Sequence, residues 1–137
     1  MIPRPRQPDT PVLDAGGLTA LARRRALLEE MRARDRWPAQ VPAVVLAEAL
    51  TGDHRRDFAV NRLLRACQVR TVDEVQAREA ARLRTATGRA GTITAAADAL
   101  VAAMAAAVAG AFVVTSDPDD LDALTAHAAR PVSVVAV

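Results

Sequence analysis

The chain has 137 residues, of which 51% are hydrophobic and 2% aromatic, and its formal net charge is +2. This length is enough for one domain with its own core, which must be filled mainly by Ala and Val. The single cysteine, Cys67, excludes an internal disulfide and fits the reducing conditions of the cytoplasm. All 18 basic side chains are Arg, a residue suited to bidentate contact with phosphate or carboxylate.

The chain begins with a Pro-rich stretch. Residues 1–10 contain Arg and Pro but no apolar signal-peptide segment, so we expect a flexible tail there and a single domain over residues 11–137. Pro11–Leu13 then predicts a short strand that ends at Asp14. Ala15–Gly17 predicts a flexible turn in which the backbone passes close to another group.

A longer helix is expected after this turn. Arginines cover its outer face, and we expect a break near Arg23. The helix ends at Trp37-Pro38, because a proline disfavours helical backbone in the residue before it. The predicted inner face consists of Leu18, Leu21, Ala22, Leu28 and Met31.

The next predicted helix carries a single charge. Gln40–Val41 is a candidate strand, and Pro42 suits the first turn of a helix over Ala43–Thr51. Glu48 is the only ionisable group in that helix and is surrounded by Val, Leu and Ala. A lone carboxylate in such a place is a candidate functional group.

A helix, a strand and another helix continue the alternation. Arg55–Ala66 predicts a helix that directs Phe58 inward, and Gln68–Arg70 predicts a short strand. Thr71–Glu74 has the composition of a capping box, so a further helix is expected from there to Thr87.

The most informative stretch covers residues 94–121. Ala95–Ala109 is apolar on all sides and predicts a buried helix, in which Asp98 is the only ionisable group. A carboxylate buried there needs hydrogen bonds, a cation or a solvated cleft. Gly110 is expected to end the helix, and Ala111–Thr115 predicts a central strand. Because Ala is a poor membrane residue and Asp98 interrupts the segment, we expect no membrane span.

Carboxylates gather directly after this strand. Asp117 and Asp119 follow it, and Asp120 suits the start of a short helix over Pro118–His127. Val132–Val137 predicts the last strand. Strands that alternate with helices in this way predict an α/β sandwich with a mostly parallel central sheet.

The predicted topology brings four acids to one edge of the sheet, where ligands of open parallel sheets bind. Asp14 ends the first strand and Asp117 follows the fourth. Glu48 and Asp98 lie early in helices that begin at the same edge. Like charges this close require protonation or a cation, and oxygen ligands without a Cys/His cluster favour Mg²⁺ or Mn²⁺. Such an ion supports phosphodiester hydrolysis.

Four segments of the chain resemble the PIN domain, and in particular the ribonuclease toxins of the VapC group. They are LDAGGLTAL (13–21), VPAVVLAEAL (41–50), ADALVAA (97–103) and VVTSDPDDL (113–121), in the order of the family. The resemblance implies a Rossmann-like α/β/α fold and Mg²⁺- or Mn²⁺-dependent endonuclease action on RNA. It also implies a homodimer and a cognate antitoxin that covers the cleft.

The resemblance also assigns site residues by position. The catalytic acids that it implies are Asp14, Glu48, Asp98 and Asp117. It implies a metal ion bound by Asp14, Asp98 and Asp117. Asp119 is expected to assist or replace Asp117 as a ligand. Relatives often have Ser or Thr after the first acid, where this chain has Ala15 and Gly16, so Thr115 and Ser116 remain as sources of a hydroxyl.

Three other classes of protein share parts of this pattern. A phosphoacceptor signalling module needs a Lys beside its acidic pocket, and the chain has none. A phosphohydrolase with an Asp nucleophile needs a second Asp two residues after Asp14, where Gly16 stands. A degenerate PIN domain that binds RNA or a partner without cutting is the alternative that stays open.

Overall fold

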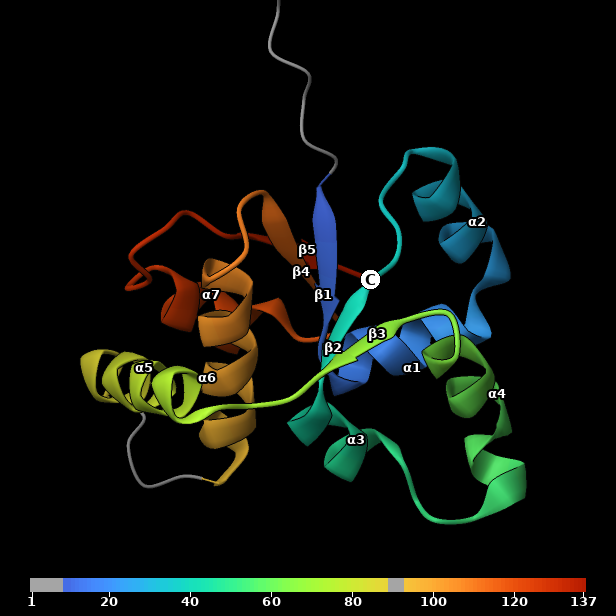
Figure 1. Ribbon diagram of the computed structural model, residues 1–137, viewed down its shortest axis with the longest axis horizontal. Coiled ribbons are helices and arrows are strands. Elements are labelled where there is room, and N and C mark those ends of the chain that lie inside the picture. Colours follow the sequence, from blue (N-terminus) through green and yellow to red (C-terminus); the bar gives the residue numbers. More distant parts are fainter. Residues whose placement is uncertain (1–8, 89–92) are drawn as a thin grey trace, which may run out of the picture.

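The computed structural model describes residues 9–88 and 93–137 (Figure 1). The strands in this part are β1 (Thr10–Leu13), β2 (Gln40–Pro42), β3 (Gln68–Arg70), β4 (Ala111–Thr115) and β5 (Ser133–Ala136). The helices are α1 (Ala15–Arg23), α2 (Arg25–Ala33), α3 (Ala43–Ala49), α4 (His54–Leu64), α5 (Glu74–Ala86), α6 (Ile93–Ala106) and α7 (Pro118–Thr125). The division into a tail and one domain stays a prediction, because residues 1–8 lie outside the described part.

The five strands form one sheet in the order β3-β2-β1-β4-β5, and each neighbouring pair is parallel. This confirms the predicted α/β class. Figure 1 shows α5, α6 and α7 on one side of the sheet and α1, α2 and α4 on the other. α3 follows β2 and lies at the carboxyl end of the strands.

The core is built between the sheet and both helix layers. All five residues of β4 are buried, as expected for a central parallel strand covered on both faces. The largest fully buried leucines are Leu13, Leu18, Leu21, Leu83, Leu121 and Leu124. Burial of one such side chain contributes about 1.5–3 kcal/mol to folding, so the strand ends that carry the acids are firmly held.

The junction between β1 and α1 differs from the prediction. Ala15–Gly17 is not a flexible turn but the first turn of α1, because the Asp14 side chain caps the helix by accepting a hydrogen bond from Gly17 N. The predicted close approach is present at this place. A Cβ atom on Gly17 would lie 1.9 Å from the carbonyl oxygen of Val114, so only glycine allows α1 to pack this closely on β4.

Two other helices were partly mispredicted, whereas the break near Arg23 is confirmed at Arg24, where α1 ends and α2 begins. Phe58 is 66% exposed rather than directed inward, because α4 buries the face that carries Val60 and Leu63. The capping box before α5 is formed by Asp73 and Gln76, two residues later than expected.

The position of Asp98 in its helix also differs from the prediction. α6 begins at Ile93 and ends at Ala106, so Asp98 lies in its second turn rather than its first. Gly110 has φ +73° and belongs to the turn into β4, not to the helix end. Glu48 lies in the last turn of α3, not early in that helix. The sequence also predicts a loop at residues 89–93, most of which lies outside the described part.

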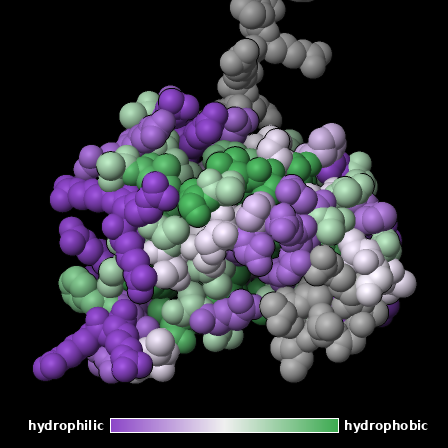
Figure 2. Space-filling view, turned by 180° about the vertical axis from the view of Figure 1, so that it is seen from behind, coloured by the Kyte–Doolittle hydropathy of each residue, from purple (hydrophilic) through white to green (hydrophobic). Residues whose placement is uncertain are grey.

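The surface carries some apolar area. The face opposite to that of Figure 1 has apolar surface near its centre, bordered by hydrophilic side chains (Figure 2). β5 forms one edge of the sheet, and its Val135 is 41% exposed. Among the helices of the described part, none has the length and apolar character needed to cross a membrane. The expected homodimer stays a prediction.

Candidate active site

Asp14 is held in place at the carboxyl end of β1. The residue is 9% exposed, and its carboxylate accepts hydrogen bonds from Gly17 N (Oδ1, 2.7 Å) and from the Thr115 hydroxyl (Oδ2). Burial raises the pKa of Asp14 above its ordinary value of 3.8, the two hydrogen bonds oppose this, and the negative charge of Asp117 adds to it. Each carboxylate oxygen has a second lone pair, so Asp14 can cap α1 and still bind another group.

The hydroxyl that contacts Asp14 comes from β4. Thr115 is fully buried, and its hydroxyl also accepts a hydrogen bond from Asp117 N at 3.1 Å. A Cβ atom on Gly16 would lie 2.0 Å from Ser116 Oγ, so Ser116 fills the space that a side chain at position 16 would need. The end of β4, through Thr115, therefore supplies a hydroxyl to Asp14, where Ala15 and Gly16 have none to offer.

The Asp98 carboxylate experiences repulsion from the other acids of the site. Burial is the largest cause of a pKa raised from 3.8 to about 6, and repulsion from Asp14, Asp120, Glu48 and Asp117 adds to it. Because such repulsion falls with distance and is screened by solvent and salt, these four carboxylates lie near enough to Asp98 for their charges to act on it. The structure thus brings together four acids that were expected to converge: Asp14, Glu48, Asp98 and Asp117.

The acids after β4 take different positions. Asp117 is exposed at the start of α7, but its side chain makes no capping hydrogen bond, so the carboxylate is not committed to the helix end. Asp119 is exposed. Asp120 is half-buried and acts on Asp98 more strongly than Asp117 does.

Asp120 was missed as a site residue in the sequence. It occupies the third position of α7, after Pro118 and Asp119. Side chains in a helix lean toward its N-terminus, so an acid at this position is directed back toward the strand end. Its distance from the start of the helix, rather than its closeness to Asp117 in the sequence, could have identified Asp120 as a site residue.

The site has an excess of negative charge. Within residues 9–88 and 93–137, no ion pair involves Asp14, Glu48, Asp98 or Asp117. The donors are all carboxylate oxygens, which suit Mg²⁺ or Mn²⁺ rather than Zn²⁺. In the same residues, no three Asp, Glu, His or Cys side chains are close enough to hold one ion together. The donor chemistry therefore fits a hard divalent cation, although the carboxylates of the described part do not converge on a single point in this structure.

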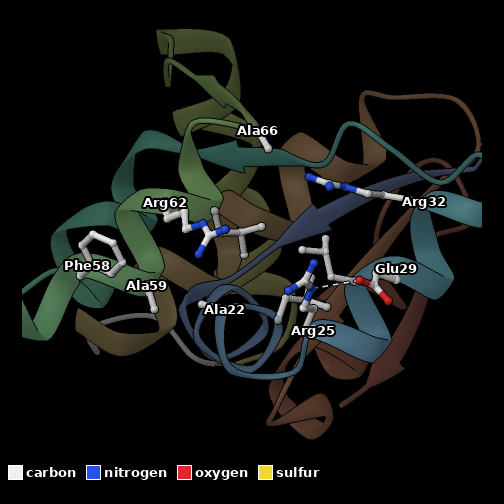
Figure 3. A pocket seen from close by; sticks show the side chains of 11 residues that line it. Ala22, Arg25, Glu29, Arg32, Phe58, Ala59, Arg62 and Ala66 are labelled. Atoms are coloured by element: carbon white, nitrogen blue, oxygen red, sulfur yellow. Dashed lines mark hydrogen bonds and ion pairs between the residues drawn. The ribbon is translucent and has the colours of Figure 1, made fainter.

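A second feature lies on the other helix layer. A groove of about 280 Å³ runs between α1, α2 and α4, and Arg25 and Arg62 extend into the space between the last two helices (Figure 3). The groove is lined by Leu21, Ala22, Arg25, Leu28, Glu29, Arg32, Phe58, Ala59, Arg62, Leu63 and Ala66. Arg25 pairs with Glu29 at 2.9 Å. The groove is therefore lined mainly by apolar side chains, and its three arginines against one glutamate give it a net positive charge.

Comparison with solved structures agrees with this architecture. VapBC from Salmonella typhimurium, bound to DNA, is 16% identical with a TM-score of 0.66, and the match covers 92% of this chain and 98% of that one. VapBC2 from Rickettsia felis, bound to a promoter fragment, is 14% identical with a TM-score of 0.69 and the same coverage. PAE2754 from Pyrobaculum aerophilum is 18% identical with a TM-score of 0.61, over 91% of this chain and 83% of that one.

Sequence comparison assigns the family. No curated protein matches the chain in sequence. The PIN domain family model matches residues 12–126, which include every acid of the site, the second half of β1 and the whole of β2, β3 and β4. The chain belongs to the PIN domain family.

Proposed function

We propose that the protein is a Mg²⁺- or Mn²⁺-dependent endoribonuclease and the toxin of a VapC-type toxin–antitoxin pair in the cytoplasm. PIN domains are generally nucleases, which supports hydrolysis of phosphodiester bonds. The observation that carries the proposal is the gathering of Asp14, Asp120, Glu48 and Asp117 near Asp98, whose pKa is raised to about 6 by burial first and by repulsion from these four acids in addition. A fold that keeps such mutual repulsion at one sheet edge is best explained by a cation that relieves it.

The site residues receive the following roles in this proposal. Asp14, Asp98 and Asp117 would hold the cation, with Asp119 or Asp120 as a further ligand, once their side chains draw closer together around it than they lie without it. When bound, the cation would polarise the scissile phosphate and lower the pKa of an attacking water. Glu48, the acid contributed by α3, would orient the water that attacks the phosphate.

Thr115 and Gly17 keep the Asp14 carboxylate in one orientation before any substrate binds. Their hydrogen bonds to its two oxygens come from β4 and α1, which are fixed by the core. Such preorganisation lowers the cost of reaching the reactive geometry. The buried side of the site is therefore rigid, while Glu48 and Asp117 lie on its exposed side.

A protein partner is the second part of the proposal. The related structures named VapBC are complexes bound to DNA, which supports an antitoxin partner for this chain. We assign the groove between α1, α2 and α4 to an amphipathic helix of that partner, with apolar side chains facing Leu28 and Phe58 and acids facing the arginines. A disordered segment of the same partner would place Arg among the carboxylates of the site and block it.

The degenerate PIN domain remains the competing function. It binds RNA or a partner without hydrolysis, and the absence of Ser or Thr at positions 15 and 16 favours it. The hydroxyl of Thr115 on Asp14 favours the active enzyme instead.

Cleavage of RNA by the purified protein separates the two. We expect single-stranded RNA to be cut in Mn²⁺ or Mg²⁺, with loss of cleavage on addition of EDTA and in Asp14→Asn. EDTA-resistant cleavage would exclude the metal mechanism. No cleavage of any RNA, with Mn²⁺ present and the fold intact, would establish the degenerate domain.

A further inference from the structure

Asp57 is a buried carboxylate that the proposed chemistry does not use. It lies in the first turn of α4 and is 4% exposed. Its oxygens accept hydrogen bonds from Thr51 N (2.9 and 3.0 Å), from the Thr51 hydroxyl (2.9 Å) and from Gly52 N (2.8 Å). These bonds hold the pKa of Asp57 below its ordinary value, and the bond from Thr51 N contributes most. The carboxylate therefore stays ionised.

The segment that Asp57 holds is the one that follows α3. α3 has seven residues and no side-chain cap at its start, and a helix this short is marginal without outside contacts. Its last turn carries Glu48, and Leu50 N closes that turn by donating to Leu46 O. Thr51 and Gly52 come directly afterwards, with Gly52 at φ +85°. The place of Glu48 therefore depends on what fixes this loop.

Holding the start of α4 does not explain Asp57, because Asp53 already performs that task. The Asp53 side chain accepts hydrogen bonds from Arg55 N at 2.9 Å and from Arg56 N at 3.3 Å. The Asp57 side chain instead bonds to Thr51 and Gly52, in the loop that follows α3.

We propose that Asp57 is a positioning residue for Glu48: by fixing Thr51 and Gly52 it sets the last turn of α3, so that the Glu48 carboxylate faces Asp98. This inference rests on the proposed function, since it assigns Asp57 to the same acidic site. It names a residue outside the acidic set on which the geometry of that set depends.

Amide hydrogen exchange and Mn²⁺-induced changes in Tm test the inference on Asp57→Asn, Glu48→Gln and the double variant. Asp53→Ala is the matched control, because it removes the cap of α4 and leaves the bonds to Asp57 in place. We expect Asp57→Asn, but not Asp53→Ala, to speed exchange of the α3 and Thr51–Gly52 amides by about tenfold. The Tm rise should shrink as much in Asp57→Asn as in Glu48→Gln, and no further in the double variant.

Unchanged exchange in α3 together with a full Mn²⁺ response in Asp57→Asn would overturn the inference, as would additive losses in the double variant. If Asp57→Asn does not fold, Thr51→Ala removes only the hydroxyl donor and should show both effects in weaker form. The absence of both effects in Thr51→Ala would also overturn the inference. A parent protein with no Mn²⁺ response and no RNA cleavage contradicts the proposed function, and that result is distinguishable because it does not involve Asp57.

Discussion

The Thr115 hydroxyl donates a hydrogen bond to Oδ2 of Asp14, although 101 residues separate the two in the sequence. They meet because β1 and β4 are neighbours in the sheet, with Leu13 beside Val114. The same hydroxyl accepts a hydrogen bond from Asp117 N. One buried threonine thus joins the first acid of the site to the segment that carries the fourth.

Replacement of this threonine should damage both stability and activity. Thr115→Val leaves one oxygen of the buried Asp14 without its partner, so we expect the free energy of unfolding to fall by roughly 1–3 kcal/mol. RNA cleavage by the folded variant should also fall, because Asp14 loses its fixed orientation. Denaturant titration and single-turnover cleavage measure the two effects.

Thr125→Val is the matched control for this change. Thr125 is also buried, and its hydroxyl donates to Leu121 O at 2.8 Å inside α7. We expect some loss of stability and normal cleavage. Equal loss of cleavage in both variants would mean that Thr115 acts only through stability.

The raised pKa of Asp98 predicts a pH dependence of stability. The pKa is about 6 in the folded protein and 3.8 as the ordinary value, so the folded state binds the proton more tightly. The resulting contribution is fully present below pH 3.8 and is lost as the pH rises through about 6. Relative to Asp98→Asn, the parent should lose on the order of 1 kcal/mol across this window, a value reduced for solvent screening. Parallel stability curves for the two proteins would show that Asp98 carries no such repulsion.

A divalent cation should relieve the same repulsion. A Mn²⁺ ion held by these acids would bind the folded state only, so we expect it to raise the Tm of the parent, by an amount that corresponds to about 2.7 kcal/mol at a concentration 100 times the Kd. The rise should be much smaller for Asp98→Asn. Asp122→Asn, an exposed acid of α7, is the control and should respond as the parent does. A Tm that ignores Mn²⁺ in the parent would remove the metal site from the proposal.

The two glycines after Asp14 should differ in their tolerance of a side chain. A Cβ atom on Gly17 would lie 1.9 Å from the backbone oxygen of Val114, which cannot move without shifting β4. At Gly16 the nearest atom is Ser116 Oγ, at 2.0 Å, at the end of an exposed side chain. We expect Gly17→Ala to cost more than about 3 kcal/mol and Gly16→Ala only about 1 kcal/mol. Thermal denaturation checks this order, and Ser116→Gly should rescue Gly16→Ala alone.

Much of the fold could be predicted from the sequence because its strands are short apolar runs between clear helices. Ala111–Thr115 is an example: it lies between an all-apolar helix and a cluster of acids, and β4 has those bounds. The junction at Ala15–Gly17 could not be predicted in this way. Glycines favour turns in isolation, and only the tertiary approach of Val114 makes them helical and necessary.

The acids of the site were predictable from topology, whereas their individual positions depend on details that no local pattern contains. Asp120 was missed because the helix start, not the order along the chain, decides which acid points toward Asp98. Glu48 lies at the end of α3 because that helix stops at Ala49. Phe58 looked like a core residue, but α4 packs with a different face and leaves it at the groove.

The exposure of Phe58 leads to the last prediction, which concerns the partner. Phe58 is 66% exposed and lies beside Arg62 at the edge of an apolar groove. An exposed aromatic side chain in such a place indicates a surface that binds another protein. Aromatic residues and arginines supply most of the binding energy at protein interfaces. Phe58→Ser and Arg62→Glu should therefore each weaken the complex with the cognate antitoxin by about 2 kcal/mol, roughly thirtyfold in Kd.

Titration of the antitoxin by calorimetry measures this loss, and RNA cleavage by each variant shows whether the acidic site is intact. Val75→Ser supplies the control, since Val75 is 75% exposed on α5, away from the groove, and should bind the antitoxin as the parent does. We expect cleavage without antitoxin to be unchanged in all three variants, because none of these residues belongs to the acidic set. Inhibition by the antitoxin should require more of it for Phe58→Ser and Arg62→Glu. Parent-like binding in both would move the partner to another surface and leave the groove without a role.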